Sequence, residues 1–376
     1  MFHLSRDNKL LSIAILLWGC GDGLYLYIWP LYIASLGADP VQIGLVLSIG
    51  TLAIAVSYIP GGFLADRFGR RRTMLWSWII GVIAMPLIAM ARDWHQLLPG
   101  ILLRSLSAFS MPAISSYVVT ASEDRDLERT YSLVISSSWS LGTLLTPSIG
   151  GWLADSLGMR PLFLLAFALY ILSTFFIFLL SEQPIVPAPE GSGYGRILSH
   201  PLLLASTIFF LVTFILYLGQ PLAPNYLEEV VGLNLSWIGT LGTFASLGSA
   251  VLAAWLGHLA TWGIFISEAL CALSFLLLLW GRTFPLLALS FFLRGSLSAC
   301  TSLAAAQIAR ILGEDEVGRG FGVFNTLVSL AYALAPYAAG QLYSFSPTLP
   351  LLVSLGLTPL AMALTALVRK EREPRG

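Results

Sequence analysis

Long apolar stretches, interrupted by short charged or Gly- and Pro-containing breaks, follow one another along the whole chain. Divided at these breaks, the pattern predicts twelve helices, at roughly 10–36, 41–65, 73–91, 96–121, 131–155, 161–181, 200–227, 235–261, 263–281, 285–312, 320–345 and 348–368. A helix needs about 20 predominantly apolar residues to cross the hydrocarbon core of a bilayer. The pattern therefore predicts an all-α integral membrane protein.

Composition leads to the same class of protein. Of 376 residues, 57% are hydrophobic and 11% are charged, whereas about a quarter of the residues of a soluble domain are charged. The net charge of zero gives no argument for a nucleic-acid partner. Cys20, Cys271 and Cys300 lie in apolar segments without the spacing of a metal site, so we expect buried thiols and no metal.

The positive charges fall mostly on one side of the predicted helices. With a cytoplasmic N-terminus, fifteen Lys and Arg residues face the cytoplasm and only Arg92, Arg160 and Arg282 face the opposite side. This bias predicts that both termini are cytoplasmic. The Pro-, Gly- and Ser-rich segment 182–199 is expected to be a cytoplasmic linker between a six-helix half at 1–181 and another at 200–376.

The two halves resemble each other at an offset near 190 residues. Arg104 matches Arg294, and Pro147 matches Pro336; Pro30, Tyr32, Gly37 and Gly44 match Pro224, Tyr226, Gly232 and Gly239. Both copies begin and end on the same side, so an axis along the membrane normal relates them. This arrangement predicts a substrate path between the halves.

The most charged stretch is GGFLADRFGRRRTM at 61–74, where Gly62, Asp66, Arg67, Gly69, Arg70 and Arg71 fill the pattern G-x-x-x-D-R-x-G-R-R. With twelve spans and two parallel halves, this motif resembles the major facilitator superfamily of secondary transporters. The resemblance implies two parallel-related six-helix halves around a central cavity. It also implies that the motif is a conformational latch. The corresponding stretch of the second half is uncharged, with Thr261 in the place of Asp66; His258 and Glu268 are candidates for a replacement contact.

Ionisable residues at membrane depth are costly and are functional candidates. Asp22 lies about twelve residues into the first helix, or roughly 18 Å along its axis, and is the candidate proton site. Arg104 resembles the helix-4 arginine of proton-driven antiporters in the same superfamily, although the glycines of that motif are replaced. Its predicted role is to influence the protonation of Asp22 or to bind an anionic group. The alternative for both residues is a structural role.

The stretch GTLLTPSIGG, with Gly142, Pro147, Gly150 and Gly151, resembles the antiporter signature of helix 5 in this superfamily. Small residues at this spacing permit close helix contact, and proline permits a bend. The resemblance implies exchange rather than symport. A helix-packing face without meaning for the transport mode is the alternative.

A set of aromatic, amide and cationic residues lies on helices that the resemblance places around the cavity. Aromatic rings with a few amides suit a neutral, amphiphilic or cationic substrate, and about half of such residues in membrane helices serve packing or the interface instead. The candidates are Tyr25, Trp29, Tyr32, Tyr117, Trp139, Gln220, Asn225, Arg294, Gln307 and Asn325.

Together these features predict a monomeric, proton-driven exporter of small amphiphilic or drug-like compounds in the inner membrane, with no cofactor beyond the proton gradient. The alternative is a sugar transporter, because Gln220 and Asn225 have the spacing of the sugar-porter pattern Q-x-x-G-x-N, with Ala223 at the glycine. The four histidines are scattered, which argues against an enzyme, and no ring of charge suggests a channel.

Overall fold

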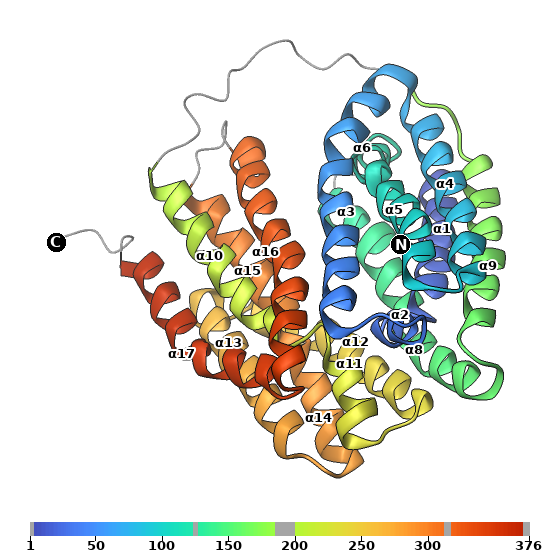
Figure 1. Cartoon of the computed structure of the whole chain (residues 1–376). Helices are drawn as coiled ribbons and strands as arrows, with labels where there is room; N and C mark the ends of the chain where they lie inside the picture. The colour runs from blue at the N-terminus through green and yellow to red at the C-terminus, as the bar shows by residue number, and fades with distance from the viewer. Residues whose placement is uncertain (1–3, 123–126, 185–199, 312–316, 371–376) are drawn as a thin grey trace. The chain divides into compact units, whose positions relative to one another are not determined.

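The structure is a computed structural model of the chain, and it describes residues 4–122, 127–184, 200–311 and 317–370 (Figure 1). The described part is helical. Its α-helices are α1 (Arg6–Gly23), α2 (Trp29–Ser35), α3 (Pro40–Phe68), α4 (Arg70–Met90), α5 (Trp94–Leu106), α6 (Met111–Thr120), α7 (Leu127–Tyr131), α8 (Ser138–Leu157), α9 (Arg160–Phe178), α10 (His200–Leu218), α11 (Ala223–Tyr226), α12 (Leu235–Gly257), α13 (Ala260–Trp280), α14 (Phe284–Arg294), α15 (Ser296–Ile311), α16 (Val317–Phe345) and α17 (Leu349–Lys370).

Within the described residues, ten helical segments are long and apolar enough to cross a membrane. Two further expected spans are helical but more polar. The first is α1, which carries Arg6, Asp7, Lys9 and Asp22, and the second is α8, which is rich in Ser, Thr and Gly. These two helices pack against each other. The all-helical membrane class is thereby confirmed.

The chain forms two compact units. The first comprises 1–38, 49–190 and 234–243, and the second comprises 39–48, 191–233 and 244–376. The start of α3 therefore belongs to the second unit and the start of α12 to the first. Of the expected linker at 182–199, residues 185–199 lie outside the described residues.

The same packing order occurs inside each unit. In the first, α1 packs on α8 and α9, and α4 packs on α5 and α9. In the second, α10 packs on α16 and α17, and α13 packs on α14 and α17. Since these helices occupy equivalent places in the two halves of the sequence, the repeat seen in the sequence extends to the packing.

Two of the expected helices are broken within their length, which the apolar pattern did not predict. The span expected at 10–36 ends as α1 at Gly23 and resumes as α2 at Trp29. The span expected at 200–227 ends as α10 at Leu218 and resumes at Ala223. Proline has no N–H, so Pro30 and Pro221 leave the carbonyl four residues earlier without a helical partner. The Tyr217 carbonyl instead accepts the Gln220 N–H at 2.8 Å.

A second pair of breaks follows the two membrane arginines. The span expected at 96–121 changes into a 3₁₀ turn at Ser107–Ser110 directly after α5, and the span expected at 285–312 is interrupted at Gly295. The Ser107 hydroxyl donates to the Arg104 carbonyl at 2.6 Å, and the Gly295 N–H bonds to the Phe292 carbonyl at 3.1 Å. Arg104 and Arg294 thus both lie where a straight helix stops.

Candidate functional site

Asp22 is the centre of a buried polar cluster in the first unit. It lies in the last turn of α1 and is 5% exposed. Arg104 of α5 donates from one terminal nitrogen to both of its carboxylate oxygens. Tyr25 donates to Oδ1 at 2.6 Å, and Tyr170 of α9 donates to the same oxygen. An ionised carboxylate only accepts hydrogen bonds, so these donors suit the charged form of Asp22.

Aromatic rings hold Arg104 in place beside Asp22. The guanidinium carbon lies 5.1 Å from the ring centre of Trp18 and 5.7 Å from that of Tyr170. These two rings stack on each other at 3.9 Å with an angle of 5° between their planes. A cation over an aromatic face is attracted by the ring quadrupole. The Trp18 and Tyr170 rings therefore stabilise the positive charge that pairs with Asp22.

Behind this layer, Trp78 of α4 fixes the position of Trp18. The two rings are 5.0 Å apart, and Trp78 Nε1 donates to the Ser173 hydroxyl at 2.7 Å. Ser173 in turn donates to the Ala14 carbonyl of α1 at 2.7 Å. Because both hydrogen bonds are buried, they tie α1, α4 and α9 together beside the charged pair.

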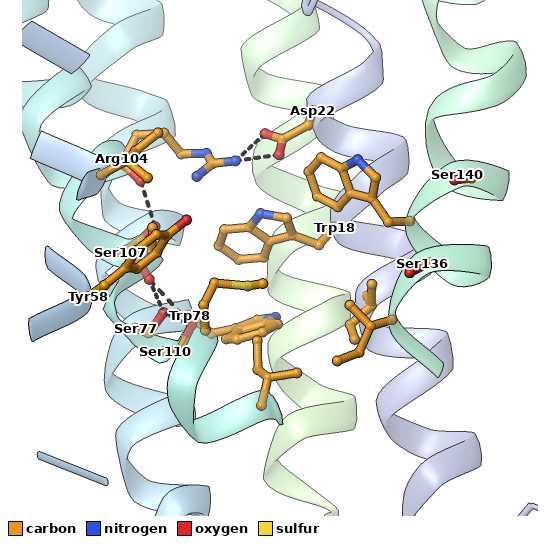
Figure 2. A pocket seen from close by; sticks show the side chains of 17 residues that line it. Trp18, Asp22, Tyr58, Ser77, Trp78, Arg104, Ser107, Ser110, Ser136 and Ser140 are labelled. Atoms are coloured by element: carbon orange, nitrogen blue, oxygen red, sulfur yellow. Dashed lines mark hydrogen bonds and ion pairs between the residues drawn. The ribbon is translucent and has the colours of Figure 1, made fainter. Parts of the chain in front are cut away.

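A cavity of about 610 Å³ opens beside the pair, entirely within the first unit. Figure 2 shows the Asp22–Arg104 pair at one end, with Trp18, Trp78 and Tyr58 further along and serine hydroxyls around them. Ser77 donates to the Ser107 carbonyl and lies 2.8 Å from the Ser110 hydroxyl. The other lining residues are Ile15, Ile54, Ala108, Met111, Ile114, Ile135, Ser136, Trp139 and Ser140.

Of the candidate cavity residues in the first half, the structure places some at the cavity or its charged pair and others away from it. Trp139 lines the cavity, and Tyr25 contacts Asp22. Trp29 and Tyr32 pack on Phe163 instead. Tyr117 donates to Asp7 at 3.0 Å and to the Ser181 carbonyl at 2.8 Å, away from the cavity lining.

The second-half candidates include a pair that parallels Asp22 and Arg104. Arg294 donates from Nε to the Gln220 side-chain oxygen and from a terminal nitrogen to the Gln220 carbonyl, both at 3.1 Å. The partner of Arg294 is therefore an amide, whereas the partner of Arg104 is a carboxylate. Asn225 and Gln307 are buried, and Asn325 is exposed on α16.

Sequence reasoning did not select Trp18, Tyr58, Trp78 or Tyr170. Trp18 precedes Asp22 by four residues, and residues four apart share a helix face, so a local signal for it existed. The side chain of Tyr170 reaches Asp22 from 148 residues away along the chain. Its role depends on the rotation of α9 against α1, which no local pattern encodes.

The glycines of the helix-5 motif pack α8 against α1. A Cβ on Gly142 would meet the Leu16 carbonyl and, at 2.9 Å, the Cys20 nitrogen. A Cβ on Gly150 would overlap the Leu24 backbone, while Gly151 lies against residues 235 and 239 of the same unit. Pro147 is buried between them. These contacts account for the small residues, and the transport mode implied by the motif stays a prediction.

The loop motif lies between α3 and α4. Gly69 joins them with a φ of 89°, a region that favours glycine. Arg70 donates to Thr120 and, at 2.9 Å, to Gln183; Arg71 donates to the Phe178 carbonyl at 2.6 Å. Both arginines therefore tie the loop to the ends of α6 and α9.

Asp66 and Arg67 of the motif, at the end of α3, are more exposed than the two arginines that tie the loop to α6 and α9. Gly62 is half-buried, and Asp66 and Arg67 are exposed. The Arg67 guanidinium lies 5.4 Å from the Phe68 ring centre. Within the described residues, Asp66 makes no hydrogen bond or ion pair. Its role as a latch stays a prediction.

We expect Asp66→Ala to slow cycling between conformations while changing the substrate Kd by no more than about twofold, the range of an exposed substitution. The carboxylate contributes no described contact here, so its removal leaves the folded unit intact. Binding in detergent and transport in proteoliposomes measure the two quantities. Arg72→Ala is the matched control, since Arg72 is 62% exposed and pairs only loosely with Glu182 at 3.6 Å. Weaker binding with normal cycling would contradict the latch.

An all-helical membrane chain with a repeated packing order and a charged pair beside a cavity has the architecture of a multi-span transporter. The family model of the Major Facilitator Superfamily matches residues 11–266 and 221–376. The chain therefore belongs to the Major Facilitator Superfamily.

Part of this chain is similar in sequence to bacterial multidrug resistance proteins. The chain is 30% identical over 273 residues to the multidrug resistance protein MdtG of Yersinia enterocolitica. The aligned region covers 65% of this chain and 62% of that protein. The chain is 31% identical over 282 residues to MdtG of Salmonella arizonae, covering 68% of this chain and 66% of that protein. The chain spans only 62% to 64% of the length of the MdtG proteins from Yersinia, Rahnella and Enterobacter.

Solved structures resemble the chain over nearly its full length. The nucleoside transporter NupG matches with a TM-score of 0.78 at 16% identity, over 97% of this chain and 98% of that chain. A POT family transporter in complex with 5-aminolevulinic acid matches with a TM-score of 0.77 at 15% identity, over 97% and 96%. At these identities the likeness establishes the fold alone.

Proposed function

We propose that this protein is a proton-driven exporter of small amphiphilic, drug-like compounds. It works as a monomer in the inner membrane with both termini in the cytoplasm, as the distribution of Lys and Arg favours. The observation that carries the proposal is the buried Asp22–Arg104 pair at the end of an aromatic cavity. The names of the MdtG relatives support it.

The charged pair supplies the coupling. With Asp22 ionised, Arg104 is held by both carboxylate oxygens and by the rings of Trp18 and Tyr170. A proton that enters from the outer side neutralises the carboxylate and removes most of the attraction for Arg104. The guanidinium is then free to turn toward the cavity. Release of the proton to the cytoplasm restores the pair and completes one exchange cycle.

The cavity indicates the substrate class. Its volume of about 610 Å³ falls within the roughly 300–1,000 Å³ typical of sites for drug-sized ligands. Trp18, Trp78 and Trp139 offer aromatic faces, which attract flat apolar and cationic groups. The serine hydroxyls provide a few hydrogen bonds without charge. An amphiphilic compound with an aromatic ring matches this lining.

The test is transport in proteoliposomes with an imposed pH gradient, using ethidium as the probe and a pH-sensitive dye. We expect ethidium transport to depend on the gradient and each addition of ethidium to move protons in the opposite direction. Collapse of the gradient with nigericin should reduce transport at least about tenfold, since secondary exchange has no other source of energy here.

Labelled glucose separates this proposal from the sugar-transporter alternative. We expect no glucose uptake and no competition between glucose and ethidium. An ethidium transport rate that does not depend on the pH gradient would contradict the proposed proton coupling. Glucose uptake that ethidium does not inhibit would favour a sugar carrier instead.

A further inference from the structure

A second buried carboxyl group lies in the second unit and takes no part in the mechanism above. Glu268 is in α13, within a segment apolar enough to cross the membrane, and its side chain is 0% exposed. The sequence placed it near the end of a helix, as a possible partner of His258. The structure places it against α17, where Thr365 contacts it.

The two oxygens of Glu268 have different surroundings. Oε1 accepts a hydrogen bond from the Thr365 hydroxyl at 2.6 Å, and Thr365 is itself 1% exposed. Oε2 is fully buried and has no hydrogen-bond partner within the described residues. None of the ion pairs found in the described part of the chain includes Glu268.

Among the described side chains, none forms an ion pair with Glu268. α13 packs on α10, α14, α15 and α17. In their described side chains, the titratable groups are Tyr217 of α10, Arg294 of α14 and Cys300 of α15, with Cys271 on α13 itself. Two hydrogen bonds of Arg294 go to Gln220. The nearby hydroxyls of Ser267 and Ser296 donate to backbone carbonyls.

These surroundings do not suit an ionised carboxylate. A buried charge requires a partner and donors to its oxygens, and leaving it unpaired is strongly unfavourable. A protonated carboxyl is neutral, so its burial costs far less. Asp22 is the contrasting case, because an arginine and two tyrosines donate to it.

We propose that Glu268 is a second proton-binding site of this protein and carries its proton in the conformation described here. In that conformation Asp22 is paired with Arg104 in the first unit, while Glu268 is neutral in the second. Release of the Glu268 proton requires a rearrangement that brings water or a donor to Oε2. The proton on Glu268 does not depend on whether Asp22 has the proposed role in coupling.

Infrared difference spectroscopy of the purified full-length protein tests this site. The C=O stretch of a protonated carboxyl group absorbs apart from that of a carboxylate. We expect the wild-type protein to have such a band and Glu268→Gln to lose it, with Asp22→Asn as the control that keeps it. Glutamine has nearly the shape of the neutral acid, so Glu268→Gln should also elute as a folded monodisperse protein.

Thr365→Val provides a second variant should Glu268→Gln fail to fold. It removes the hydrogen bond to Oε1 and leaves the carboxyl, so the band should persist and shift to higher frequency. An unchanged protonated-carboxyl region in the folded Glu268→Gln protein would overturn the proposal, and so would an unshifted band in Thr365→Val. Should Asp22→Asn still exchange ethidium for protons while the Glu268 band is present, that result would contradict the proposed coupling role of Asp22 and leave the proton-binding site at Glu268 supported.

Discussion

Asp22→Asn should lower gradient-driven ethidium transport by about tenfold or more, equivalent to at least about 1.4 kcal/mol. Asparagine can still accept hydrogen bonds from Tyr25 and Tyr170, but it neither carries the negative charge that holds Arg104 nor binds a transferable proton. The substitution therefore removes the coupling step more selectively than it alters the shape of the site. Initial rates in proteoliposomes at equal reconstituted protein provide the measurement.

Asp93→Asn is the matched control for this variant. Asp93 is the N-cap of α5 and accepts the N–H groups of His95 and Gln96 at 2.9 and 3.1 Å. Asparagine caps helices about as well as aspartate, so transport should stay within about twofold of the wild type. If Asp22→Asn moved ethidium and protons as the wild type does, Asp22 would have no part in coupling.

Gly150→Ala is expected to destabilise the first unit by roughly 1–3 kcal/mol or more, the range of overpacking substitutions. A Cβ at this position would overlap the carbonyl and the Cα of Leu24, so α8 would have to move away from α1. Displacement of α1 would also disturb Asp22, which lies two residues before Leu24. Thermal unfolding in detergent, followed by tryptophan fluorescence, measures the effect.

Gly356→Ala in α17 is the same chemical change, but we expect it to stabilise the protein instead of destabilising it. Gly356 is helical and exposed, and a Cβ there would have no atom within 4 Å. Alanine at an exposed helical position is favoured over glycine by about 0.5–1 kcal/mol, so the unfolding temperature should rise slightly. Equal shifts for the two variants would show that the close approach of α8 to α1 does not limit stability.

The class of protein could be predicted from the sequence because membrane helices are long and consist mostly of apolar residues. Asp22 and Arg104 were also identifiable, since charge at membrane depth is rare, and the structure places them in contact. Their roles in coupling stay predictions. The position of Glu268 shows the limit of this approach: its depth and its contact with Thr365 depend on how α13 meets α17.

The breaks in the helices were equally hard to predict from hydropathy. Most residues around Gly23 and Gly219 are apolar, although Asp22 and Gln220 lie directly beside them, and Pro30 and Pro221 follow the ends of α1 and α10. Tyr170 and Trp78 reach the site through the rotation of their helices. Such rotations are set by packing across the whole unit.

The end of α1 has one more consequence for the charged pair. Asp22 lies in the last turn of α1, where the aligned peptide dipoles produce a partial negative charge. This field opposes a negative carboxylate at that position. Arg104 and the two tyrosines that donate to Asp22 therefore act against the field of its own helix end. Without Arg104, the carboxylate would face that field with no counter-charge.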